Sequence, residues 1–255
     1  SADKLDFFVG NGTRMVLDVN SRISLSNNDS SGAVGTTLFG YRAGLSVPAG
    51  AIQNTFIGHD VAIATITNAA DSNTTASNNV AVGEDALKDT TTGCQNIAMG
   101  RNALEDNSTG DLNVALGYNA GAAITTGGQN TIIGAYAGDA MTTMSNCILI
   151  GYNAGTAINN NVANGTTIVG RDAGERLTNG TKNTAMGYSA LTGNHQGGYN
   201  TAIGYESQRG VTDNAHNYST SVGYRSLYAA TTSDHNTALG FKAGAALTTG
   251  HSNVL

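Results

Sequence analysis

The sequence predicts an all-β protein: a β-solenoid, or β-roll, of about twelve coils with roughly 17 residues in each coil. Three observations support this prediction. Only 12% of the 255 residues are charged, whereas about 25% are charged in an ordinary globular domain. The chain has 34 glycines and a single proline, a composition that suits short strands and tight turns better than long helices. A glycine-centred unit recurs along most of the chain.

The repeat is recognised by one glycine, here called the anchor glycine. When sequence numbers of successive anchor glycines are subtracted, seven of the eleven differences equal 17, one equals 18, two equal 19 and one equals 25. A period of about 17 residues is too short for a two-helix repeat, which needs about 33 residues, and it fits one solenoid coil with two short strands and two turns. The anchor glycines are Gly40, Gly58, Gly83, Gly100, Gly117, Gly134, Gly151, Gly170, Gly187, Gly204, Gly223 and Gly240.

The residues around each anchor glycine form columns. The residue one before it is always large and apolar, and the residue three before it is always Val, Ile or Thr. These two columns share one face of a short strand, because side chains alternate along a strand, and we expect that face to be the packed one. Three residues after the anchor glycine, Ala or Ser stands in eleven of the twelve units, which predicts a second tight packing point.

A column of asparagines lies four residues before the anchor glycine in eight of the twelve units. Side-chain amides at this position can form a ladder along the stacked coils. Since one coil buries little apolar area, stability should come from stacking and from association. The residues are Asn54, Asn79, Asn96, Asn113, Asn130, Asn183, Asn200 and Asn236.

The array covers residues 36–255, and residues 1–35 do not follow it. Asp6 to Gly10 and Met15 to Ile23 predict short strands, with a hairpin turn at Asn11-Gly12. We expect residues 1–35 to form a small β cap or the end of a preceding module. The next anchor glycine would fall just beyond the last residue, so we expect the sequence to stop inside a thirteenth repeat of a longer protein.

Three segments lengthen the repeat. Ala62 to Asn78 lies in the longest gap between anchor glycines, and Thr156 to Gly165 and Gln208 to Tyr218 lie in the two next longest. Insertions in solenoids fall on loops of one face, which is often the binding face. We therefore expect specificity to lie in these segments, above all in Ala62 to Asn78.

The array resembles the repeats of phage tail fibres, many of which carry a self-cleaving chaperone domain of the endosialidase type. Its Asn-x-Ala-Ile-Gly core is also similar to the head repeats of trimeric autotransporter adhesins, whose period is shorter. The resemblance covers residues 36–255. The runs that carry it are Asn113-Val114-Ala115-Leu116-Gly117-Tyr118-Asn119-Ala120-Gly121, Asn200-Thr201-Ala202-Ile203-Gly204-Tyr205 and Leu247-Thr248-Thr249-Gly250-His251-Ser252-Asn253.

The resemblance implies a homotrimeric fibre, either intertwined or side by side, with a structural and adhesive role as a shaft or head. The implied location is the virion tail fibre, and the alternative is a bacterial trimeric adhesin on the cell surface. Host attachment would use a surface glycan or a protein receptor. A remote alternative is an ice-binding solenoid, which needs Thr at alternate strand positions, whereas Thr occupies only one of the two here.

The sequence predicts no enzyme and no catalytic or cofactor-binding residues. A G-x-S-x-G motif is absent from the sequence. A solenoid lyase or hydrolase needs charged clusters on adjacent coils, and only two groups approach this. Glu84 and Asp85 with Arg101, and Asp172 with Glu175, are interpreted as ordinary surface charge.

No metal site and no cofactor are predicted either. The sequence has no C-x-x-C pair and no calcium-binding G-G-x-G-x-D motif. Cys94 and Cys147 should lie three coils, or about 14 Å, apart, so we expect no disulfide between them. The five histidines fall at unrelated repeat positions and are interpreted as solvated loop residues: His59, His195, His216, His235 and His251.

Charge and hydropathy argue against two classes of partner. The net charge is −6, and the 12 Lys and Arg residues form no basic stripe, so no nucleic-acid surface is expected. The sequence contains no apolar run long enough for a transmembrane helix, so no membrane insertion by a helix is expected.

Aromatic residues follow seven of the anchor glycines and leave two interpretations open. They form either a packing stripe at the turn corners or a row of exposed rings that stack on sugars. Their regularity favours packing, because receptor sites usually lie on irregular loops. The residues are Tyr41, Tyr118, Tyr152, Tyr188, Tyr205, Tyr224 and Phe241.

Overall fold

The fold is seen in a computed structural model of the chain. It describes strand residues 5–9, 12–17 and 23–25, and residues 35–46, 50–64, 76–159, 164–210 and 215–255. Large parts of the three predicted specificity segments, residues 65–75, 160–163 and 211–214, lie outside the described residues.

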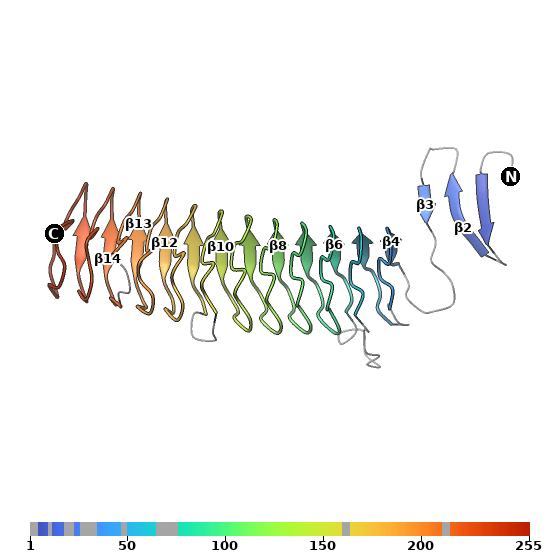
Figure 1. The fold of residues 1–255 in the computed structure, drawn as a ribbon, viewed down its shortest axis with the longest axis horizontal. Helices are drawn as coiled ribbons and strands as arrows, with labels where there is room; N and C mark the ends of the chain where they lie inside the picture. The colour runs from blue at the N-terminus through green and yellow to red at the C-terminus, as the bar shows by residue number, and fades with distance from the viewer. Residues whose placement is uncertain are drawn as a thin grey trace.

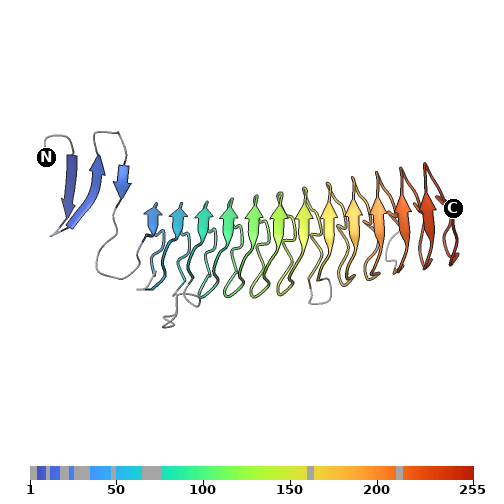
Figure 2. The ribbon, with the colours of Figure 1, turned by 180° about the vertical axis from the view of Figure 1, so that it is seen from behind.

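The predicted β-solenoid is confirmed. Twelve parallel strands form one sheet in sequence order, and the described residues contain no helix (Figure 1; Figure 2). Every one of these strands is three residues long and ends directly before an anchor glycine. The strands are β4 (Thr37–Phe39), β5 (Thr55–Ile57), β6 (Val80–Val82), β7 (Ile97–Met99), β8 (Val114–Leu116), β9 (Thr131–Ile133), β10 (Ile148–Ile150), β11 (Thr167–Val169), β12 (Thr184–Met186), β13 (Thr201–Ile203), β14 (Thr220–Val222) and β15 (Thr237–Leu239).

A separate three-stranded antiparallel sheet lies at the N-terminal end of the sequence. β1 (Leu5–Val9) pairs with β2 (Gly12–Leu17) as an antiparallel hairpin, and β2 also pairs with β3 (Ile23–Leu25). The hairpin was predicted, but its turn was placed wrongly, because Gly12 is a strand residue that pairs with Val9. The single strand predicted over Met15 to Ile23 is therefore wrong, since two strands share that range. The intervening sequence contains Asp, Asn and Ser, which are uncommon in strand interiors.

Each coil has one strand among the described residues, and the predicted second strand is wrong. The remainder of the coil turns through left-handed residues at fixed positions, two and four after the anchor glycine and five before it. In the central coils, Asn102, Leu104 and Leu112 have φ of 56°, 51° and 59°. Such residues interrupt an extended strand. Hydrogen bonds between coils hold them, as when Leu104 N–H donates to the carbonyl of Ala120 at 3.1 Å.

The anchor glycines are required where neighbouring coils approach most closely. Gly134 has φ +132°, and a Cβ added there would lie 2.4 Å from the carbonyl oxygen of Gly151 in the next coil. A side chain would therefore be strained by its backbone and would also collide with backbone. The same contact recurs along the array, which explains why the column has no exception.

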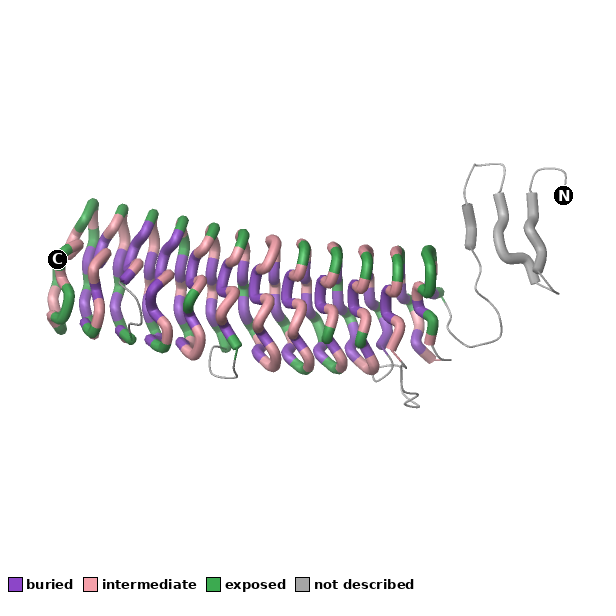
Figure 3. Tube along the Cα trace, in the orientation of Figure 1, coloured by how far each residue is buried: buried purple, intermediate pink, exposed green. Residues whose placement is uncertain are grey.

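The packed face of the strand is the reverse of the one predicted. The middle residue of most strands is fully buried, whereas the residues one and three before the anchor glycine are half-buried or exposed (Figure 3). The buried middle residue is Ala in several coils and a large side chain, such as Phe56 or Leu149, in others. The predicted packing point three residues after the anchor glycine is confirmed, since Ala103, Ala120 and Ala137 are fully buried.

Each of these coils has one large side chain in its interior, which stands either four or seven residues after the anchor glycine. In the coil of Gly100, Leu104 fills the interior and the residue three later is Asn107. In the coil of Gly117, Gly121 replaces that leucine and Ile124 supplies the bulk instead. A Cβ on Gly121 would lie 3.0 Å from Ile124 Cδ1. The interior of the coil therefore has room for a large side chain at one of these two positions but not at both.

The predicted asparagine ladder is confirmed, but its side-chain amides bond mainly to backbone groups and not only to one another. The side chain of Asn113 is fully buried, and its Oδ1 accepts the backbone N–H of Asn130 at 3.1 Å. Its Nδ2 donates to the carbonyl of Gly127 at 2.8 Å. Amide–amide bonds occur in addition, such as Asn130 Nδ2 to Asn113 Oδ1 at 3.0 Å. The ladder therefore satisfies backbone groups in the buried interior of the coil.

Candidate functional site

The first candidate surface is the outer strand face, defined as the residues one and three before each anchor glycine. Because the middle strand residue points inward, both columns point outward. Large apolar side chains remain accessible there in the middle of the array, with Ile97 38% and Met99 45% exposed. The face continues over the twelve strands from β4 to β15, which at ~4.8 Å per strand spans roughly 50 Å. The residue one before the anchor glycine is apolar in every coil, and an accessible apolar column of this length marks an interaction site.

The second candidate surface is the aromatic column, the residues directly after the anchor glycines. Tyr188, Tyr205, Tyr224 and Phe241 form a continuous stack with ring centroids 5.2 to 5.3 Å apart and planes within 11° of one another. Stacked rings cover each other's faces and leave their edges to solvent. This geometry supports the packing interpretation for the inner rings and excludes a continuous row of open faces for sugars.

A second aromatic ladder, which the sequence analysis missed, lies five residues before the anchor glycine. Tyr199 stacks on Tyr218 at 4.9 Å, and Tyr218 stacks on His235 at 5.1 Å. Lys182 Nζ from the preceding coil lies 5.3 Å from the centroid of Tyr199. The signal was available in the sequence, since this column holds an aromatic ring in three successive coils.

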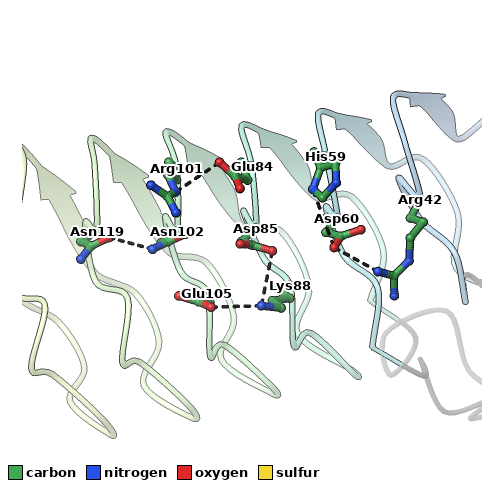
Figure 4. Close-up of polar contacts among 10 residues, drawn as sticks. All are labelled: Arg42, His59, Asp60, Glu84, Asp85, Lys88, Arg101, Asn102, Glu105 and Asn119. Carbon is green, nitrogen blue, oxygen red and sulfur yellow. Dashed lines mark hydrogen bonds and ion pairs between the residues drawn. The ribbon is translucent and has the colours of Figure 1, made fainter.

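A row of ion pairs crosses the first coils on residues one, two and five after the anchor glycine (Figure 4). Arg101 Nε lies 3.2 Å from Glu84 Oε2, whereas Asp85 pairs with Lys88, which also reaches Glu105 at 3.4 Å. Burial would lower the pKa of Lys88, but its hydrogen bonds to Asp85 and Glu105 raise it. The predicted cluster is thus divided into separate pairs, each worth about 1 kcal/mol or less.

The other predicted charge pair, Asp172 and Glu175, lies in a hollow of about 440 Å³ that spans three coils. Asp172 is engaged, since its Oδ2 lies 3.2 Å from Arg171 Nε and its Oδ1 accepts Asn153 Nδ2 at 3.2 Å. The carboxylate of Glu175 makes no hydrogen bond or ion pair with a described residue. The hollow is lined by Asp172, Glu175, Arg176, Tyr188, Ser189, Thr192, Gly193, Arg209 and Gly210.

The five histidines do not come together in one site. One of them, His216, contradicts the prediction that all five are solvated. His216 is fully buried, not solvated, and its carbonyl accepts Asn200 Nδ2 at 2.7 Å. Burial lowers the pKa of His216 to about 4, against the opposing influence of the Asp234 charge and of the nearby backbone of Thr231. Neither ring nitrogen makes a hydrogen bond with a described residue. His216 stands seven residues before its anchor glycine, a position that is also buried in the preceding coils at Gly180 and Gly197. The wrong interpretation arose because His216 lies within the lengthened segment Gln208 to Tyr218, where the repeat position is not evident from the spacing.

The buried histidine should make the fold sensitive to acid. An unfolded chain binds a proton on His216 below about pH 6.5, whereas the folded chain binds it only near pH 4, so stability should fall as the pH drops through this window. The loss should reach about 3 kcal/mol. NMR titration of the histidine ring protons, with His216→Gln to assign the signal, should give a midpoint near 4. A midpoint near 6.5 would show that the ring is solvated.

Cys94 and Cys147 form no disulfide with each other, as predicted. Cys147 takes an asparagine position in the ladder, and its backbone N–H donates to Asn130 Oδ1 at 3.0 Å. In the part of the chain that the structure describes, no three His, Cys, Asp or Glu side chains come together as metal ligands would. The same part contains no helix that could cross a membrane.

Comparison with known proteins returned no relative. No family model matches the chain, and no curated protein and no solved structure matches it.

Proposed function

We propose that the chain is a structural and adhesive segment of a fibre, of the kind found in phage tail fibres, in which three copies associate along the outer strand face. The observation that carries the proposal is the accessible apolar column on every coil of the array. A folded monomer would have to keep this whole stripe in water, which is costly for apolar surface. The number three comes from the resemblance of the repeat to trimeric fibres.

A second copy of the chain is the partner that this face fits. The stripe repeats with the strand spacing of about 4.8 Å, so a partner that covers it must present apolar groups at the same spacing. The chain itself has that spacing over twelve strands. Coils that stack in register would give a stiff rod, whose backbone hydrogen bonds and asparagine ladder resist local opening and proteolysis.

The same architecture would serve a bacterial trimeric surface adhesin. This alternative is supported by the Asn-x-Ala-Ile-Gly core, which is similar to the head repeats of trimeric autotransporter adhesins. Both assignments require a homotrimer, so the oligomer is tested first. Attachment to a host surface would then use side chains outside the outer strand face.

Charges placed on the outer strand face should prevent association. The variant Met99→Glu/Ile133→Glu adds two carboxylates to this face, and burying them against a partner would cost several kcal/mol. We expect light scattering after size-exclusion chromatography to give a lower mass than for the unmodified chain. The matched control, Gln95→Glu/Gln129→Glu, adds the same charge to exposed residues in the same part of the array and should keep the oligomer. Equal masses for all three proteins would refute the proposed interface.

A further inference from the structure

We propose that the hollow beside Tyr188 binds a sugar ring of a surface polysaccharide, which stacks on the free face of Tyr188. The inference rests on the proposed role in attachment and names the ligand class and the place on the fibre. The volume of the hollow, about 440 Å³, lies within the range of small-ligand sites in proteins.

Tyr188 differs from the rings behind it because it begins the aromatic stack. One face lies against Tyr205, with centroids 5.2 Å apart. The preceding position of the aromatic column is Arg171, whose guanidinium lies over the ring of Tyr152 at 5.6 Å and pairs with Asp172. No described ring or cation therefore covers the other face of Tyr188, which is 41% exposed. That face is turned toward the preceding coil, whose residues share the hollow with Tyr188.

The hollow is lined at one position of the turn by three successive coils, and two of these coils have glycine there. Arg176, Gly193 and Gly210 stand six residues after their anchor glycines, so the side-chain column is absent from the second and third of these coils. The Gly193 N–H donates to the carbonyl of Arg209 at 2.6 Å, which keeps the two coils in register behind the opening. Most of the lining thus comes from the regular turns of three coils, whereas Arg209 and Gly210 belong to Gln208 to Tyr218, one of the segments in which we expected specificity.

Two charged groups at the hollow have no partner among the described residues. The carboxylate of Glu175 and the guanidinium of Arg176 make no hydrogen bond or ion pair there, whereas Arg209 donates to the hydroxyl of Tyr228 at 2.7 Å. A carboxylate accepts hydrogen bonds from sugar hydroxyls, and a guanidinium donates to hydroxyl and ring oxygens. The hydroxyl of Thr192 lies in the same hollow and already donates to the carbonyl of Asp172 at 2.9 Å.

This combination favours a saccharide over other ligands. The apolar face of a pyranose packs on an aromatic ring while its hydroxyls need both donors and acceptors, and one open ring face, one carboxylate and one guanidinium supply these groups. A phosphate or nucleotide would meet the carboxylates of Asp172 and Glu175 as well as the arginines, and that repulsion disfavours it.

The test is saturation-transfer difference NMR of the full chain with the methyl glycosides of glucose, galactose, N-acetylglucosamine and glucuronic acid. We expect at least one glycoside to receive saturation on its ring C–H protons, and Tyr188→Ala to weaken its binding at least tenfold. The control Tyr224→Ala removes a ring whose two faces are already covered, and it should leave the affinity unchanged. Arg176→Gln changes an exposed side chain that makes no hydrogen bond or ion pair with a described residue, and it should also weaken binding several-fold in a fully folded protein.

Two results would overturn the inference. One is that no glycoside receives saturation, and the other is that Tyr188→Ala and Arg176→Gln both bind like the unmodified chain. Either result leaves the fibre proposal standing if the chain is still a trimer. Loss of the trimer with retained glycoside binding would refute the fibre proposal alone.

Discussion

Gly134→Ala should destabilise the solenoid by about 4 kcal/mol. The left-handed backbone of Gly134 costs a non-glycine residue about 1–3 kcal/mol, and forcing atoms into a packed site costs about as much again. The added methyl would lie 2.4 Å from a backbone oxygen, and backbone in the middle of a stack cannot move without shifting the neighbouring coils. The urea midpoint measured by circular dichroism should fall accordingly.

Gly240→Ala is the matched control for this prediction. Gly240 has φ +133°, nearly the same as Gly134, but a Cβ there meets nothing within 4 Å. Its substitution should therefore cost only the backbone strain, about 1–3 kcal/mol. If both variants lose the same stability, close approach between coils is not the reason for the glycine column.

Asn113→Ala should cost about 3 kcal/mol, the second large effect. The substitution leaves the carbonyl of Gly127 and the N–H of Asn130 buried without their partner, and each such group costs about 1–3 kcal/mol. Because the loss lies in the middle of the ladder, amide hydrogen exchange should quicken first in the coils on either side of Asn113.

The end of the same ladder provides the comparison. The side chain of Asn253 donates to Asn236 Oδ1 at 2.9 Å and lies in a half-buried position. Asn253→Ala should therefore cost about 1 kcal/mol, and the Asn253 N–H keeps its own bond to Asn236 Oδ1. Equal losses for the two variants would mean that the ladder does not act through buried backbone groups.

Much of the fold could be predicted because the same residue types recur at the same positions of every coil. The anchor glycine, the three-residue strand before it and the asparagine column each follow from one physical requirement that recurs in every coil. The direction of the strand side chains could not be predicted in the same way. Apolar residues occur on both strand faces, and the larger side chains of Met99 and Leu116 suggested the core, whereas the interior of these two coils holds Ala98 and Ala115.

The candidate site was harder to predict, because it depends on residues from three coils. Asp172 and Glu175 were recognised as a charge pair, but the open face of Tyr188 is defined by the rings that it does and does not contact. The hollow that Gly193 and Gly210 help to line can be recognised only when the coils are stacked. The burial of His216 could have been inferred, because its counterpart Gly197 is buried in the preceding coil, but the lengthened segment Gln208 to Tyr218 obscures that alignment in the sequence.

The fibre proposal depends on the outer strand face being covered by copies of the same chain. Sedimentation equilibrium of the unmodified chain tests this most directly. We predict a single species with three times the chain mass of 25.9 kDa, which does not dissociate on dilution into the micromolar range. A stable species of 25.9 kDa would contradict the proposal, because the apolar face would then be exposed in the native protein.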